Sequence, residues 1–176
     1  MHGHAVTIVD TDEKSLTRSK NFMRENLEQG VARNIFSGDE AEAILKRLAF
    51  TTDLNAAQGT DLVIEAIVEN LAVKKELFAQ LEALVPVSTV LATNTSSLSV
   101  TAIAAQLKQP QRLAGYHFFN PVPLMKVVEV VAGLKTSDTV CEQLDACTRQ
   151  MGHTPVRTRD TPGFIVNHAG RGYGTE

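Results

Sequence analysis

The feature that most constrains the fold is a regular alternation of short apolar runs with amphipathic segments. The run "DLVIEAIV" (61–68) is apolar at most positions, which is typical of a strand buried on both faces of a parallel sheet. The next segment, "NLAVKKELFAQLEALV", has the spacing of an amphipathic helix. Because this alternation continues along the chain, we predict an α/β fold in which a parallel sheet is wound by helices.

The same patterns place the other elements. Turn residues mark "NPVP" (120–123), where two prolines interrupt any strand. A boundary signal, Thr161-Pro162-Gly163, divides a domain at 1–160 from a short remainder at 161–176. We predict strands at 5–10, 49–54, 61–68, 89–95, 112–119, 125–133 and 153–160, and helices at 12–35, 38–48, 70–85, 99–107 and 136–151.

Composition excludes several classes of function. The net charge of −3 shows no basic footprint for nucleic acid, and no apolar run approaches the length of about 20 residues that spans a bilayer. The N-terminal "MHGHAVTIVD" lacks the pattern of a secretory signal. Cys141 and Cys147 point to different sides of a predicted helix and form no disulfide or metal motif. We expect no nucleic-acid or membrane partner, no metal, and a reducing, cytoplasmic setting.

Polar residues follow the predicted strands, and ligands of such sheets bind outside the carboxyl ends of the strands. The strand from Ala5 ends in Asp10, whose carboxylate can accept two hydrogen bonds from an adenosine ribose. Its charge would repel a 2′-phosphate, which favours NAD over NADP. A solvated aspartate at a strand end is the alternative, because no glycine loop accompanies Asp10.

His117 and Glu129 form a second candidate pair. Glu129 interrupts a run of four valines, so it lies either on the wet face of an edge strand or buried with a partner. If the chain reverses near Pro123, antiparallel pairing places the two residues opposite each other. A buried carboxylate beside a histidine is a general-base arrangement, because it fixes the tautomer and stabilises the imidazolium. A core histidine with an unrelated surface glutamate is the alternative.

The segment "ATNTSSLS" (92–99) gathers small hydroxyl and amide groups at another strand end. Such runs often cap helices, and capping can coexist with substrate contact in one segment.

The chain resembles a known family. The motifs "TNTSSLS", "HFFNPVPLMKVVEVV", "DTPGFIVN" and "DLVIEAIVENLAVKKELFAQL" are similar, in the same order, to the L-3-hydroxyacyl-CoA dehydrogenases, including 3-hydroxybutyryl-CoA dehydrogenases. The resemblance covers essentially the whole chain, and "HFFNPVP" followed by a glutamate at this distance is highly specific. It implies a Rossmann-like NAD-binding domain, followed from residue 161 by the start of a helical substrate and dimerisation domain.

The resemblance also implies roles for particular residues. His117 is the catalytic base, Glu129 its orienting partner, and Asn167 a further active-site amide. The polar groups that meet the substrate and the nicotinamide are Ser96 and Asn120. The remaining cofactor contacts implied are Asp10, Glu69 and Lys74.

The helical pair after Asp10 resembles an arm that helps to hold CoA. Its basic residues could meet CoA phosphates, although a solvated basic face is the alternative interpretation. These residues are Lys14, Arg18, Lys20, Arg24 and Arg33.

Family members begin with a strand and a G-x-G-x-x-G loop, neither of which this sequence contains. We therefore expect a chain truncated at both ends, with doubtful activity by itself and with open edges on the strands from Ala5 and Asp61. The expected function is NAD-dependent oxidation of L-3-hydroxyacyl-CoA to 3-oxoacyl-CoA in a parent enzyme that is a homodimer.

There are two alternatives to this dehydrogenase function. One is a non-catalytic remnant that keeps a CoA- or partner-binding surface. The other is a different β-hydroxyacid dehydrogenase, against which "HFFNP" argues because a lysine base is expected there by analogy.

Overall fold

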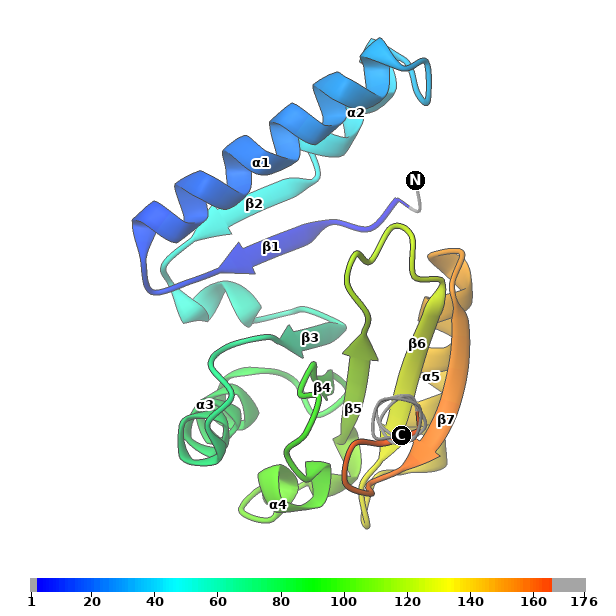
Figure 1. Cartoon of the computed structure of the whole chain (residues 1–176). Coiled ribbons are helices and arrows are strands. Elements are labelled where there is room, and N and C mark those ends of the chain that lie inside the picture. The colour runs from blue at the N-terminus through cyan, green and yellow to red at the C-terminus, as the bar shows by residue number, and fades with distance from the viewer. Residues whose placement is uncertain (1–2, 166–176) are drawn as a thin grey trace, which may run out of the picture. The chain divides into compact units, whose positions relative to one another are not determined.

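A computed structural model describes residues 3–165 of the chain. The chain divides into two compact units, Met1–Ala57 and Gln58–Glu176. Each unit contains its own sheet, two-stranded in the first and five-stranded in the second (Figure 1). The predicted domain limits, 1–160 and 161–176, stay a prediction.

The first unit is a parallel strand pair with two helices. Strand β1 (Val6–Val9) pairs with β2 (Leu48–Thr51), and helices α1 (Glu13–Ala32) and α2 (Gly38–Leu45) connect them; a 3-10 turn, Leu54–Ala57, follows. The Asp12 side chain caps α1 by accepting hydrogen bonds from the backbone of its first turn. Ser37 and Glu40 form a reciprocal capping box at the start of α2. Both caps explain why the helices begin after short polar residues.

The second unit has the strand order β3-β4-β5-β6-β7. All neighbouring strands are parallel except β5 and β6, which are antiparallel because the chain reverses between them at 120–126. The sheet is therefore mixed, with its antiparallel pair where the predicted 117/129 pairing places it, and the α/β prediction is confirmed. The elements are β3 (Leu62–Glu65), α3 (Leu71–Leu84), β4 (Val90–Thr93), α4 (Val100–Ala104), a 3-10 turn (Pro110–Arg112), β5 (Leu113–Phe118), β6 (Val127–Ala132), α5 (Asp138–Gln150) and β7 (Thr154–Arg159).

Strand β3 is shorter than the apolar run predicts. It ends at Glu65, and the following Ile67 and Val68 are 41% and 65% exposed. The Glu65 carboxylate accepts a hydrogen bond from the Ile67 backbone N–H at 2.7 Å, which turns the chain out of the sheet. Hydrophobicity alone therefore overestimated the length of this strand.

The core of the second unit lies between the sheet and α5. Side chains from β4, β5 and β6 that share one face pack against the apolar face of α5. Helix α5 lies against the sheet and contacts β5, β6 and β7 (Figure 1). Tyr116 is fully buried there, and its hydroxyl is 2.7 Å from the hydroxyl of Thr148. This packing fixes β5 and β6 together. The core residues are Val90, Ala92, Ala114, Tyr116, Val128, Val130, Val140, Cys141 and Leu144.

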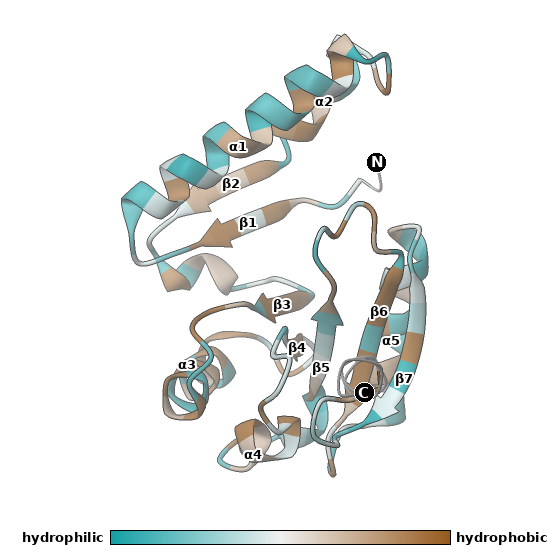
Figure 2. Ribbon diagram, viewed as in Figure 1, coloured by the Kyte–Doolittle hydropathy of each residue, from teal (hydrophilic) through white to brown (hydrophobic). Residues whose placement is uncertain are grey.

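Strands β1 and β3 each have one paired edge within residues 3–165, which agrees with the expectation of open edges on both strands. Figure 2 shows both strands as largely hydrophobic, and Val6 and Ile64 are 45% and 44% exposed. Such edges offer unpaired backbone groups to a further strand.

Two further predictions concern membrane-spanning helices and the two cysteines. In the described part, no helix combines the length and the apolar character that crossing a membrane requires. Cys141 and Cys147 are both free, the first buried and the second half-buried.

Candidate active site

His117 and Glu129 face each other across β5 and β6. They are direct partners in the antiparallel register, and His117 Nδ1 lies 2.7 Å from Glu129 Oε2. Glu129 is 0% exposed and His117 6%. The predicted pairing is confirmed. A fully buried carboxylate at this distance orients the imidazole and stabilises its protonated form. The other ring nitrogen, Nε2, makes no hydrogen bond within residues 3–165.

Glu129 also holds the segment after β7. Its Oε1 accepts a hydrogen bond from the Ile165 backbone N–H at 2.9 Å, so one carboxylate joins the histidine to the "TPGFI" turn. Phe164 in that turn packs edge-on against the His117 ring, with centroids 5.7 Å apart. Positive φ angles at Gly163 and Phe164 let the chain make this turn. The predicted active-site amide Asn167 lies outside the described residues.

The hydroxyl run after β4 is organised by Asn94 and Thr95. Asn94 Oδ1 accepts the Phe118 backbone N–H at 2.9 Å, which ties the end of β4 to the end of β5 beside His117. Thr95 Oγ1 accepts the Leu98 N–H at 2.9 Å and closes a tight loop that carries Ser96. The predicted capping function is present as well, since Ser99 caps α4 by accepting from the Ala102 N–H.

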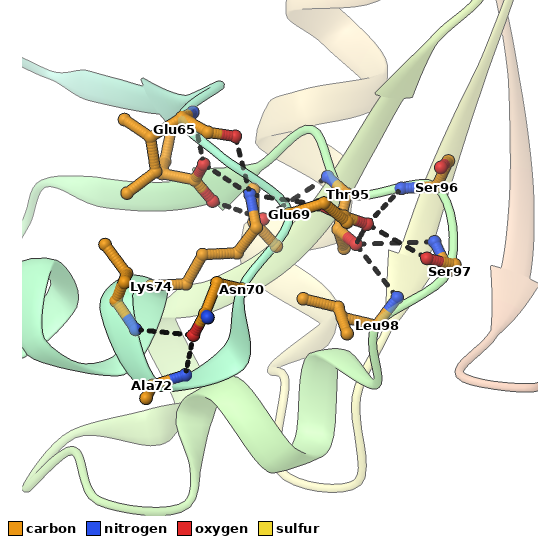
Figure 3. Close-up of polar contacts among 12 residues, drawn as sticks. Glu65, Glu69, Asn70, Ala72, Lys74, Thr95, Ser96, Ser97 and Leu98 are labelled. Carbon is orange, nitrogen blue, oxygen red and sulfur yellow. Dashed lines mark hydrogen bonds and ion pairs between the residues drawn. The ribbon is translucent and has the colours of Figure 1, made fainter.

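Glu69 binds this loop from the other side. Its Oε1 accepts hydrogen bonds from the Thr95 hydroxyl, from the Ser96 backbone N–H at 3.3 Å and from the Ser97 hydroxyl at 3.1 Å (Figure 3). Partial burial by itself raises the pKa of Glu69, but the hydrogen bond from Thr95 and the charge of Lys74 outweigh it and hold the pKa below its ordinary value. The carboxylate is therefore ionised beside Ser96.

Lys74 is buried under this network. Its side chain is 1% exposed, and Nζ lies 2.6 Å from Glu65 Oε1 and 3.2 Å from Glu69 Oε2 (Figure 3). Glu65 is 3% exposed and was given no role by the sequence, although it stands among the polar residues at a strand end. The structure thus brings Glu69, Lys74 and Ser96 together, with Lys74 buried and Glu69 partly exposed; their roles as cofactor contacts stay a prediction.

Two other predicted residues, Asn120 and Asp10, lie outside this network of contacts. Asn120 is exposed in the turn that follows β5, and no hydrogen bond joins its side chain to His117 in the described part of the chain. Asp10 belongs to the first unit, where it is exposed at the end of β1. Its Oδ1 accepts the Asp12 N–H at 2.9 Å, which orients the carboxylate at the start of α1.

The basic residues of α1 lie along two open surface hollows of the first unit. One hollow of about 370 Å³ is lined by Lys20 and Arg24 together with Lys46 and the apolar Leu48 and Phe50. The other is lined by Lys14 and Arg18 with Glu13 and Thr17. Cations beside apolar side chains suit a ligand that carries phosphates and an aromatic or alkyl part. Among residues 3–165, no cluster of histidine, cysteine or acidic side chains is arranged to hold a metal ion.

A histidine oriented by a buried carboxylate at the end of a strand of an α/β sheet is an arrangement that can exchange a proton with a bound ligand. The family pattern described as "3-hydroxyacyl-CoA dehydrogenase, NAD binding domain" matches residues 1–161. The chain therefore belongs to the 3-hydroxyacyl-CoA dehydrogenase family, and the matched part is its NAD-binding domain.

Relatives and solved structures agree with that family. The chain is 50% identical over 99% of its length to a 3-hydroxyadipyl-CoA dehydrogenase of Escherichia coli, and 46% identical over 94% to the human mitochondrial hydroxyacyl-coenzyme A dehydrogenase. It superposes on the crystal structure of an E. coli 3-hydroxybutyryl-CoA dehydrogenase with a TM-score of 0.96, over 98% of this chain and 36% of that one, at 50% identity. The Rossmann-like prediction is confirmed with it. The chain spans 37% and 54% of the lengths of the two curated relatives.

NAD is the cofactor of this domain family, and the residues present fit two parts of it. The exposed, oriented carboxylate of Asp10 suits the hydroxyls of a ribose, and the ionised Glu69 beside Ser96 suits polar groups at the nicotinamide end. The turn from β1 to α1 is Asp10-Thr11-Asp12, and no glycine-rich phosphate loop occurs within residues 3–165.

Proposed function

We propose that the protein carrying this chain oxidises L-3-hydroxyacyl-CoA to 3-oxoacyl-CoA, with NAD as the hydride acceptor. The observation that carries the proposal is the 2.7 Å contact between His117 Nδ1 and the fully buried Glu129. With Nδ1 held by the carboxylate, Nε2 takes the proton of the substrate 3-hydroxyl. In the reverse direction the imidazolium protonates the forming alkoxide. NAD supplies the hydride chemistry when it is bound.

The remaining site residues position the reactants. Ser96 stands on the loop held by Glu69, at the same edge of the sheet as His117, and is proposed to contact substrate and nicotinamide. Asn120 and Asn167 are proposed as further polar contacts with the thioester and the reacting oxygen. Holding the reacting atoms in place accounts for a large share of the rate gain in such reactions.

Specificity for the cofactor is proposed to come from Asp10. A carboxylate accepts hydrogen bonds from both ribose hydroxyls and repels a 2′-phosphate, so NAD is preferred to NADP. Glu69 is proposed as the second acidic cofactor contact, with Lys74 beneath it.

Binding of CoA is assigned to the first unit. The basic side chains along α1, with Arg33 at its end, are proposed to meet the phosphates of an acyl-CoA substrate. The homodimer and the reducing, cytoplasmic setting belong to this proposal too; the two free thiols suit such a setting.

The test is an assay of the purified full-length protein with acetoacetyl-CoA and NADH, followed by the loss of NADH absorbance. Turnover that requires the CoA thioester and fails with free acetoacetate supports the proposal. Binding of acetoacetyl-CoA without any turnover would favour the alternative, a non-catalytic protein that keeps a CoA-binding surface.

A further inference from the structure

Glu65 is a buried carboxylate, and both of its oxygens are hydrogen-bonded within the protein. Oε1 lies 2.6 Å from Lys74 Nζ and accepts the Ile67 N–H at 2.7 Å, while Oε2 accepts the Thr93 hydroxyl at 2.6 Å. These partners come from α3, the segment after β3, and β4. An ionised pair so deep in a protein is costly unless each charge is fully hydrogen-bonded, which is the case here. The Glu65–Lys74 pair is therefore a specific feature of this fold.

Lys74 is surrounded by acceptors of the protein itself. Its ammonium has three N–H groups, and three acceptors surround it: Glu65 Oε1, Glu69 Oε2 and, at 3.4 Å, the Ile67 carbonyl. The side chain is 1% exposed. Glu69, the partner of Lys74 on the side of the Ser96 loop, is 39% exposed. Figure 3 shows Glu69 between Lys74 and that loop.

Glu69 connects Lys74 to the loop that carries Ser96. One of its oxygens pairs with Lys74, and the other accepts from Thr95, Ser96 and Ser97. Rotation of the Glu69 carboxylate would break both sets of contacts at once. The chain of contacts Glu65–Lys74–Glu69 thus runs from the buried end of β3 to the exposed loop.

We propose that Glu65 is a positioning residue for cofactor binding: it anchors Lys74, which fixes the Glu69 carboxylate against the loop of Ser96. This inference rests on the proposed function only for the identity of the ligand. The positioning itself is a property of the free protein and can be measured without any cofactor.

The main variant is Glu65→Gln, which keeps the shape and removes the charge. We expect the KM for NADH to rise about tenfold, a usual effect of losing a charged hydrogen bond, while kcat changes less than about threefold. Amide hydrogen exchange at Ser97 and Leu98 should accelerate in the free protein, while exchange at Val130 in the core stays as in the wild type. The matched control is Glu76→Gln, an exposed position on the same helix, which should change neither quantity.

A double-variant cycle tests the route through Lys74. If Glu65 acts through Lys74, the Glu65→Gln/Lys74→Met variant is no worse than Lys74→Met alone. The double variant also removes both buried charges together, so it should fold even where Glu65→Gln leaves the lysine poorly paired. Additive effects on KM, or wild-type exchange at Ser97 and Leu98 in the double variant, would overturn the proposal. A wild-type protein without turnover would overturn the proposed function instead, and the exchange data would still decide the role of Glu65.

Discussion

Glu129 Oε2 and His117 Nδ1 lie 2.7 Å apart between directly paired positions of two antiparallel strands, and both side chains are buried. The strand pairing sets this distance, so the histidine is oriented before any substrate binds. Preorganisation of this kind is what a general base requires.

The first prediction concerns the charge of Glu129. Glu129→Gln keeps the shape but removes the charge that stabilises the imidazolium, so we expect kcat to fall by about 10- to 1,000-fold with a smaller change in KM. Steady-state kinetics with acetoacetyl-CoA and NADH measure both. An unchanged kcat would show that the carboxylate has only a structural role, namely holding Ile165.

The second prediction concerns cofactor choice. The wild-type protein should have a higher kcat/KM with NADH than with NADPH, and Asp10→Ala should narrow the gap, because the carboxylate that excludes a 2′-phosphate is gone. Thr11→Ala, at the next position of the same turn, is the control and should keep the preference. Equal kcat/KM values in the wild type would remove Asp10 from the ribose role.

The third prediction concerns the packing beneath the site. A Cβ atom on Gly115 in β5 would lie 2.7 Å from Val131 Cβ and 3.0 Å from Val100 Cγ2. Gly115→Ala should therefore lower the free energy of unfolding by about 1–3 kcal/mol, the usual cost of overpacking. Urea unfolding measures it. Gly38→Ala, where a Cβ meets nothing within 4 Å, is the matched control and should not destabilise the protein.

The fourth prediction concerns acid stability. Partial burial raises the pKa of Asp160, but hydrogen bonds from Thr101, Ser99 and Val100 outweigh it, so the folded-state pKa lies below the ordinary value of 3.8. A depressed pKa stabilises the fold above pH 3.8, and this contribution is lost as the pH falls through the folded-state value.

Asp160→Asn should accordingly be less stable than the wild type at pH 7, and the difference should shrink below about pH 4. Thermal unfolding across this pH range measures the effect. The exposed Asp61→Asn is the control and should track the wild type. A stability difference that does not change with pH would show that the Asp160 charge contributes nothing to it.

The sequence predicted the order of strands and helices along the chain, because buried strands and amphipathic helices have different hydrophobic periodicities. It also predicted the His117–Glu129 pair, since antiparallel pairing about a turn keeps the sum of paired positions constant. The division into two compact units could not be predicted in this way, because periodicity carries no information on which strands pair.

Glu65 and Thr95 show the limit of the same reasoning for the site. Glu65 interrupts an apolar strand much as Glu129 does, and that signal could have marked it as a buried, partnered carboxylate. Its partners, however, come from α3 and β4, and only the fold brings them to it. Thr95 gave no signal beyond its place in a run of hydroxyl residues, which are common at helix caps.

The most direct test of the account is the turnover of acetoacetyl-CoA with NADH by the purified full-length protein and by its His117→Gln variant. His117→Gln keeps a hydrogen-bonding side chain on β5 but removes the group that exchanges the proton. The account predicts robust turnover in the wild type and a loss of about two to four orders of magnitude in kcat for the variant, the usual contribution of a general base. A folded variant that keeps kcat within about tenfold of the wild type would contradict the assignment of His117 as the base.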